Sequence, residues 1–133
     1  MDARTRELVR MRASSRCEYC RFRESAVPYL VFHVDHIIAK HVDHASDDPQ
    51  GLALACSECN YHKGPNLVSI DPETKEQVSI FHPRIDDWES HFSVENGSIV
   101  GLTPIGRATA RLLNMNAPRL VRLRHELVDP GEF

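Results

Sequence analysis

Two short motifs with the same spacing decide the fold: CEYC at residues 17–20 and CSEC at residues 56–59. Together they contain all 4 cysteines of the chain. A C-x-x-C turn directs both thiolates at one point, so two such turns supply four tetrahedral ligands, with metal–sulfur distances near ~2.3 Å. We therefore predict a structural zinc ion in a closed site that stabilises the fold and does not catalyse. The predicted ligands are Cys17, Cys20, Cys56 and Cys59.

The chain around these motifs has the composition of a soluble globular protein. It has 133 residues, 41% hydrophobic and 26% charged, which fits one domain over residues 1–133. No apolar run approaches the ~20 residues needed to cross a bilayer, and residues 1–6 (MDARTR) are not followed by an apolar signal region. We expect a cytoplasmic protein without a membrane partner.

Two other uses of the cysteine pairs are weaker than zinc binding. Disulfides are rare in the reducing cytoplasm, where we expect this chain. A redox-active C-x-x-C would not need a second copy. The gap between the pairs is longer than in a zinc ribbon, so we expect an insert between the two zinc knuckles.

Charge is unevenly distributed, although the net charge is only −3. Residues 1–24 contain seven arginines against four acids, and residues 104–126 contain five arginines against one acid. The middle of the chain is acidic. Two basic flanks therefore bracket an acidic centre, which is consistent either with binding to a nucleic-acid backbone or with an ordinary solvated surface.

Hydrophobic spacing and turn residues predict an α+β fold in three parts. These are a basic N-terminal helix (1–15), a core motif (17–64) and a C-terminal extension (65–133). In the core we expect residues 17–34 to form a knuckle and then a strand, because 29–32 are β-prone. A second strand follows at 52–55, and then a helix that ends at Gly64. In the extension we expect a strand at 78–81, a hairpin turning at Asn96-Gly97, and helices that begin at Thr103-Pro104 and break at 116–118.

The stretches beside the cysteines resemble a known family. HVDHIIAKH occupies residues 33–41, and NYHKG follows Cys59 at residues 60–64. With the cysteine pairs, they resemble the HNH endonuclease family, in its stand-alone prokaryotic type with a four-cysteine zinc site. Residues 17–64 follow the family's order and spacing with one exception, and GLTPIGR at 101–107 is similar, more loosely, to the tail of such proteins. The resemblance implies a ββα-metal finger with zinc knuckles, followed by a small hairpin and C-terminal helices.

The same resemblance implies a metal-dependent endonuclease that hydrolyses phosphodiester bonds of DNA by nicking or double-strand cleavage. His36 matches the general base, and Asp35 and Asn60 match the ligands of one catalytic ion. An imidazole accepts protons near neutral pH, and an oxygen ligand set favours magnesium or manganese. On a strand, Asp35 and His36 point to opposite faces, so the chain must bend for both to serve one site. A homodimer is possible.

One position departs from the family pattern, because Gly51 stands where the middle asparagine should precede Leu52. That asparagine braces the loop that faces the base histidine. Gln50, Asp48 or the Gly51 backbone could replace it. The departure keeps a second function open: a non-catalytic zinc module that binds nucleic acid or a protein partner.

Several further side chains are weaker candidates for contact with substrate. An ordinary surface or loop role is the alternative for each. The candidates are His33, His62, Lys63, Arg107 and Arg111, with His41 and His44 as loop residues near the site. His82, Trp88 and His91 are expected in the small core of the extension.

Overall fold

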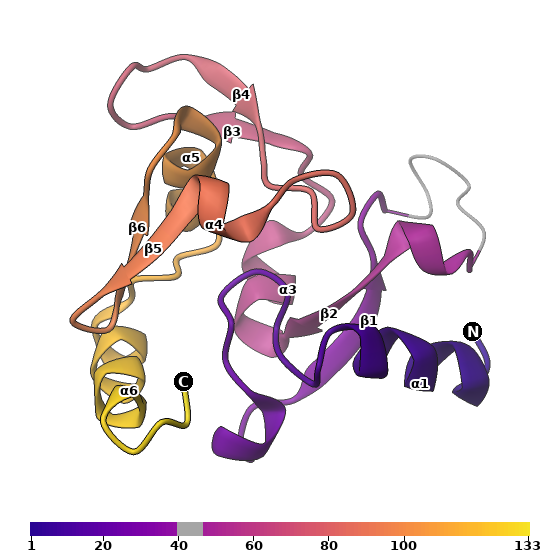
Figure 1. Cartoon of the computed structure of the whole chain (residues 1–133). Coiled ribbons are helices and arrows are strands. Elements are labelled where there is room, and N and C mark those ends of the chain that lie inside the picture. Colours follow the sequence, from indigo (N-terminus) through magenta and orange to yellow (C-terminus); the bar gives the residue numbers. More distant parts are fainter. Residues whose placement is uncertain (40–46) are drawn as a thin grey trace.

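The computed structural model describes residues 1–39 and 47–133 (Figure 1). His41 and His44 lie outside the described residues. A hairpin of two antiparallel strands, β1 (Phe32–His36) and β2 (Leu52–Cys56), forms the centre of the N-terminal half. Helices α1 (Ala3–Arg12) and α3 (Ser57–Lys63) both contact the two strands. This mixture of helices with small antiparallel sheets confirms the predicted α+β, ββα-metal class.

Strand β2 is the most deeply buried element of this half. All five of its residues, LALAC, are buried, as expected for a strand covered on both faces. Its register places Leu52 opposite His36 and Ala53 opposite Asp35. Helix α3 starts directly after β2, and the sulfur of Cys56 caps it by accepting from the Cys59 amide at 3.5 Å. The second zinc knuckle is therefore also the strand-to-helix turn.

The C-terminal extension contains two further hairpins and three helices. Its elements are β3 (Val68–Ile70), β4 (Gln77–Ser79), α4 (Trp88–His91), β5 (Phe92–Glu95), β6 (Ser98–Gly101), α5 (Pro104–Leu112) and α6 (Pro118–Val128). Asn96 and Gly97 have φ of 51° and 84°, the left-handed pair that a tight hairpin needs. The Thr103 hydroxyl caps α5 by accepting from the Gly106 amide at 3.0 Å. The predicted hairpin and helix start are both confirmed.

Three predicted boundaries are wrong. Strand β1 spans Phe32–His36, so it begins after most of the β-prone residues 29–32 and ends beyond the predicted residue 34. The Leu30 amide is used in a turn to Val27, and β2 pairs only with residues 32–36. Strand β4 ends at Ser79, since the Phe81 amide donates to the Thr109 hydroxyl at 2.8 Å and not to a strand. The N-terminal helix ends at Arg12, before the expected 1–15 boundary.

Three short helices and one strand had no counterpart among the sequence predictions, and one of these helices is α4. The other two helices are 3₁₀ turns, η1 (Glu24–Ala26) and η2 (Pro49–Gly51). The strand is β3, which pairs with β4 over three residues. Three residues are too few to show the alternation of apolar and polar residues that predicts a strand from sequence.

The extension packs onto the first zinc knuckle. The indole nitrogen of Trp88 donates to the Tyr19 carbonyl at 2.8 Å, and the Trp88 ring lies 5.0 Å from that of Phe92. Trp88 is buried, as predicted. Within the described part of the chain, no helix is long and apolar enough to cross a membrane.

Candidate active site and zinc centre

The four cysteines meet in one buried cluster. Their sulfur atoms all lie within 4.8 Å of one another, and each residue is at most 3% exposed. The Cys20 and Cys56 sulfurs are 3.7 Å apart. That distance matches the edge of a tetrahedron with metal–sulfur bonds of ~2.3 Å, which is about 3.8 Å. The donor set and its geometry therefore fit a zinc ion, and the predicted cluster of Cys17, Cys20, Cys56 and Cys59 is confirmed as a metal-binding arrangement.

The electrostatics of the cluster favour a bound cation. Burial opposes ionisation of Cys17, but hydrogen bonds with the other three cysteines outweigh it and hold its pKa well below the ordinary value. Burial, and then the neighbouring sulfurs, raise the pKa of Cys20 well above it. Without a metal, some of the four cysteines therefore remain protonated thiols. Zinc binding converts thiols to thiolates and releases their protons.

Arg124 brings a positive charge from α6 to this cluster. Its side chain is fully buried, and its guanidinium carbon lies 4.7 Å from the centroid of the Phe22 ring. It donates to the carbonyls of Gly97 at 2.6 Å and Met115 at 3.2 Å. Burial lowers the pKa of Arg124, while Cys20 and the other sulfurs act in the opposite direction. The extension therefore contributes to the surroundings of the zinc site.

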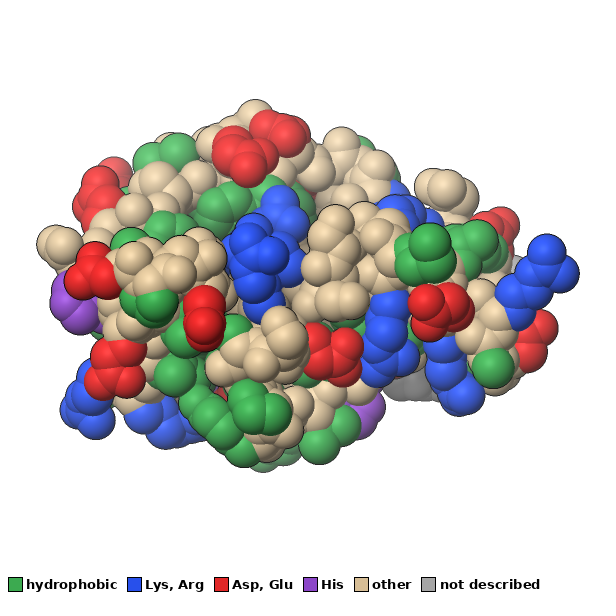
Figure 2. Space-filling view, turned by 60° about the horizontal axis from the view of Figure 1, so that its bottom comes forward, with side chains coloured by type: hydrophobic (Ala, Val, Ile, Leu, Met, Phe, Trp, Pro, Cys, Tyr) green, Lys and Arg blue, Asp and Glu red, His purple; other side chains and the backbone are tan. Residues whose placement is uncertain are grey.

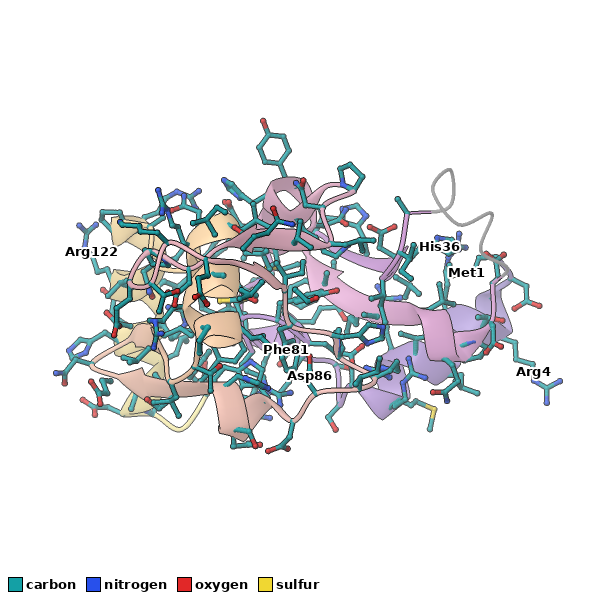
Figure 3. All side chains as sticks on the ribbon, turned by 90° about the horizontal axis from the view of Figure 1, so that it is seen from above. Met1, Arg4, His36, Phe81, Asp86 and Arg122 are labelled. Carbon is teal, nitrogen blue, oxygen red and sulfur yellow. The ribbon has the colours of Figure 1, made fainter. Side chains whose placement is uncertain are left out.

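His36 lies at the end of β1 and contacts a carboxylate. Its Nε2 is 3.0 Å from Oδ1 of Asp47, and the His36 side chain is 14% exposed. The other Asp47 oxygen is 3.0 Å from the N-terminal ammonium of Met1. Figure 3 shows His36 and Met1 side by side, with Arg4 at the same end of the molecule. Sequence reasoning missed Asp47, although the acidic pair Asp47-Asp48 shortly before Gly51 was a visible signal.

Asp35 lies on β1, which contacts α3, the helix that carries Asn60. Burial lowers the pKa of Lys63, and the half-buried Asp35 carboxylate acts in the opposite direction. Asn60 precedes Lys63 by three residues, and residues at that spacing share one face of a helix. The Asn60 side chain is half-buried. Asp35 and Asn60 are thus carried by two elements in contact, β1 and α3.

Lys63 itself is turned into the protein. It is 4% exposed, and its ammonium donates to the Ile37 carbonyl at 2.7 Å. This bond ties the end of α3 to the residue that follows His36. The Lys63 charge is engaged inside the fold, and the expected contact with phosphate stays a prediction.

Arg107 is also engaged internally. Its guanidinium makes two hydrogen bonds of 2.9 Å to the carboxylate of Asp71, which is fully buried. These bonds hold the pKa of Asp71 well below its ordinary value. The Arg107 side chain is 22% exposed, and its expected contact with the nucleic-acid backbone stays a prediction. Arg111, one turn further along α5, is exposed.

The remaining histidine candidates lie around α3 and β1. His33 is exposed on β1, two residues before Asp35. His62 is half-buried, and its Nδ1 lies 2.8 Å from the Glu58 carbonyl, within α3. Its ring meets that of Tyr61, which is 81% exposed. These placements leave His33 and His62 as untested candidates for contact with substrate.

Gly51 braces the site through its backbone. Its carbonyl accepts from the Ile37 amide at 2.9 Å, while the Asp48 side chain caps the η2 turn at Gln50. A Cβ built on Gly51 meets nothing within 4 Å, so a side chain would fit there. Among the three possible replacements for the missing asparagine, the Gly51 backbone is the one that bonds to the end of β1, at Ile37. Asp47, which was not among the three, contacts the His36 ring.

Comparison with known proteins agrees with this geometry. Residues 17–66 match the family model described as HNH endonuclease. None of the curated proteins compared with the chain matches it. The matched segment contains both cysteine pairs, β1, β2 and α3. The match covers less than half of the chain, and it supports a nuclease or nucleic-acid-binding role for residues 17–66.

Proposed function

We propose that the protein is a metal-dependent endonuclease that hydrolyses phosphodiester bonds of DNA, with His36 as the general base. The observation that supports this most strongly is the distance of 3.0 Å between His36 and Asp47. A base histidine needs a partner that fixes its ring and its tautomer. Asp47 supplies that partner in a chain that lacks the middle asparagine of the family pattern.

The hydrogen bond with Asp47 determines the tautomer of a neutral His36 ring. If the ring is neutral, the carboxylate of Asp47 can only accept, so the proton sits on Nε2 of His36. Nδ1 then carries the lone pair and can take a proton from a water molecule. The water oxygen attacks phosphorus while the 3′-oxygen leaves, which yields a 5′-phosphate and a 3′-hydroxyl. General-base assistance of this kind contributes about 10² to 10⁴ in rate.

Asp35 and Asn60 are the proposed ligands of the catalytic ion. Both offer oxygen, which suits magnesium or manganese. Two protein ligands leave positions for water and phosphate oxygens. The ion would supply charge stabilisation to the phosphate and the leaving oxygen. Lys63 positions this pair, because its bond to the Ile37 carbonyl fixes α3 against the end of β1.

One observation favours the second candidate function, a non-catalytic zinc module that binds nucleic acid or a protein. Gly51 has no side chain with which to brace the site. The zinc cluster needs no catalytic residue to stabilise the fold. A chain that had lost activity would retain this cluster and its binding surface.

Incubation of the protein with supercoiled plasmid separates the two functions. We expect nicked or linear product with magnesium or manganese and none without an added divalent ion. Asp35→Ala and Asn60→Ala should cut slowly and be partly rescued by high metal concentration, because they weaken ion binding only. Intact zinc content with no cleavage under any divalent ion would favour the non-catalytic module.

A matched pair of carboxylates tests the role of Asp47. Asp47→Ala should lower kcat with little change in KM, because it frees the His36 ring. Asp48→Ala removes the neighbouring carboxylate, which caps Gln50 and not His36, and should leave kcat unchanged. Asp47→Asn retains an oxygen acceptor and should recover part of the activity. Equal effects of Asp47→Ala and Asp48→Ala would contradict the assignment.

A further inference from the structure

A basic cleft lies apart from the His36 motif, between the first knuckle and the extension. Its volume is about 860 Å³. One wall comes from the end of α1 and residues 13–23, and the other from α4, β5, α6 and Phe133. Figure 2, which turns the bottom of Figure 1 toward the reader, shows Lys and Arg side chains in the middle of that face. The arginines that line the cleft are Arg12, Arg16, Arg21 and Arg23.

Two of these arginines are held in place by aromatic rings. The guanidinium carbon of Arg21 lies 5.1 Å from the centroid of the Trp88 ring, and that of Arg16 lies 5.5 Å from the Phe133 ring. The Nε of Arg16 also donates to the Arg21 carbonyl at 3.1 Å. A guanidinium stacked on a ring keeps its N–H edge free for a planar oxygen acceptor such as phosphate. The two side chains therefore lose less conformational entropy when a ligand binds.

The positive charges in the cleft are not fully balanced. Four arginines line the cleft, and Arg12 is bound to backbone carbonyls. Among the described residues, the acids on the lining are Glu18, Glu89 and Asp129. Glu18 is already engaged, because it pairs with Arg84 and accepts from the Leu54 amide at 2.8 Å.

Arg12 connects the cleft to the catalytic strand pair. Its two terminal nitrogens donate to the carbonyls of Pro49 at 2.9 Å and Leu52 at 2.8 Å. Leu52 pairs with His36 across the sheet. One wall of the cleft is therefore fastened to the segment that positions the proposed base.

We propose that this cleft binds the phosphodiester backbone of a nucleic acid through Arg16, Arg21 and Arg23. The sequence suggested a different face, on α5, where Arg107 is bound to Asp71. The proposal rests on the proposed function only in taking nucleic acid as the ligand, and it concerns binding, not cleavage. Phosphate contacts position a duplex without reading its sequence, so affinity through the cleft should be independent of sequence.

Fluorescence anisotropy with a labelled DNA duplex, without added magnesium, tests the cleft. Arg21→Gln/Arg23→Gln should weaken binding at least about fivefold and reduce the salt slope by about 0.9 for each phosphate that the protein no longer neutralises. The charge-matched control is Arg119→Gln/Arg122→Gln, which changes two exposed arginines of α6 and should change affinity less than twofold. Arg122 lies at the end of the molecule opposite His36 (Figure 3). Arg23→Lys keeps the charge and should retain most of the affinity.

The outcomes separate the cleft from the nuclease proposal and from a smaller ligand. Equal losses of affinity in the two double variants, or no loss in Arg21→Gln/Arg23→Gln, would reject the proposal that the cleft binds nucleic acid. Plasmid cleavage by the wild type would still support the nuclease proposal. Binding that depends on the cleft, without any cleavage, would support the cleft proposal and reject the nuclease proposal.

Calorimetry with inorganic phosphate tests for a smaller ligand. If phosphate binding depends on Arg21 and Arg23 but duplex affinity does not, the ligand is a small phosphate and the proposal is wrong. Zinc content and circular dichroism of each variant confirm the fold, and Arg23→Gln alone, at an exposed position, repeats the test if the double variant unfolds.

Discussion

Two pairs of arginines, one pair from each half of the molecule, have different partners. In the N-terminal half, Arg16 and Arg21 lie on aromatic rings beside an open cleft. In the extension, Arg107 and Arg124 are bound to buried partners and hold the fold together. The sequence shows two similar basic flanks, yet Arg16 and Arg21 of the first lie on rings beside a cleft of about 860 Å³, whereas Arg107 of the second is bound to a buried carboxylate. A count of charges along a chain therefore does not locate a binding surface, because the partners of each charge decide its role.

The largest expected effect concerns the zinc cluster, on which both halves depend. Cys56 is both a predicted zinc ligand and the cap of α3. Cys56→Ser should give unfolded or insoluble protein, since structural zinc supplies about 10–16 kcal/mol of apparent binding free energy that is also folding free energy. Metal analysis should find one zinc ion per wild-type chain. A folded Cys56→Ser protein, or wild type with two disulfides and no zinc, would contradict the assignment.

A smaller effect is expected where the extension reaches the cluster. Arg124→Met leaves the Gly97 and Met115 carbonyls without their donor and removes a positive charge near the sulfurs. We expect a stability decrease of about 1–3 kcal/mol for each carbonyl that stays unsatisfied, and faster zinc release to a chelator. Arg122→Met, on the exposed side of α6, should change stability by no more than about 0.5 kcal/mol. Equal zinc release from both variants would mean that the two halves are independent.

The contrast within α5 can be tested with two neighbouring arginines. Arg107→Ala should lower the melting temperature because the buried Asp71 loses its partner, whereas Arg111→Ala should not. Arg107 holds the pKa of Asp71 below its ordinary value. The pair therefore stabilises the fold above about pH 4 and loses this effect as the pH falls further. The difference between wild type and Arg107→Ala should shrink on acidification, and a constant difference would point to packing alone.

The smallest expected effect is at Gly51. Its Cβ position is open, so Gly51→Asn should fold normally and leave cleavage equal to or faster than that of the wild type. Thermal unfolding and plasmid cleavage measure both parts of this prediction. A marked drop in activity would show that the glycine is required, and the bracing by Asp47 and the Gly51 backbone would then need revision.

Linear motifs could be read from the sequence, and interactions between distant residues could not. The cysteine spacing led to the confirmed cluster, and Asn96-Gly97 to the confirmed hairpin, because each signal lies within a few residues of chain. Asp47 reaches His36 through the geometry of a loop, which no local pattern encodes. Lys63 and Arg107 were candidates for contact with substrate. Only the fold supplies the Ile37 carbonyl that Lys63 binds and the Asp71 carboxylate that Arg107 binds.

The central claim is that His36 accepts the proton in phosphodiester cleavage, and the most direct measurement compares plasmid cleavage by wild type and His36→Ala at several magnesium and manganese concentrations. We expect the His36→Ala rate to fall by about 10² to 10⁴ with zinc content and DNA binding intact, and to gain nothing from extra metal. Asp35→Ala should recover partly under the same conditions. If wild type and His36→Ala cut equally well, His36 is not the base, and His33 or His62 becomes the next candidate.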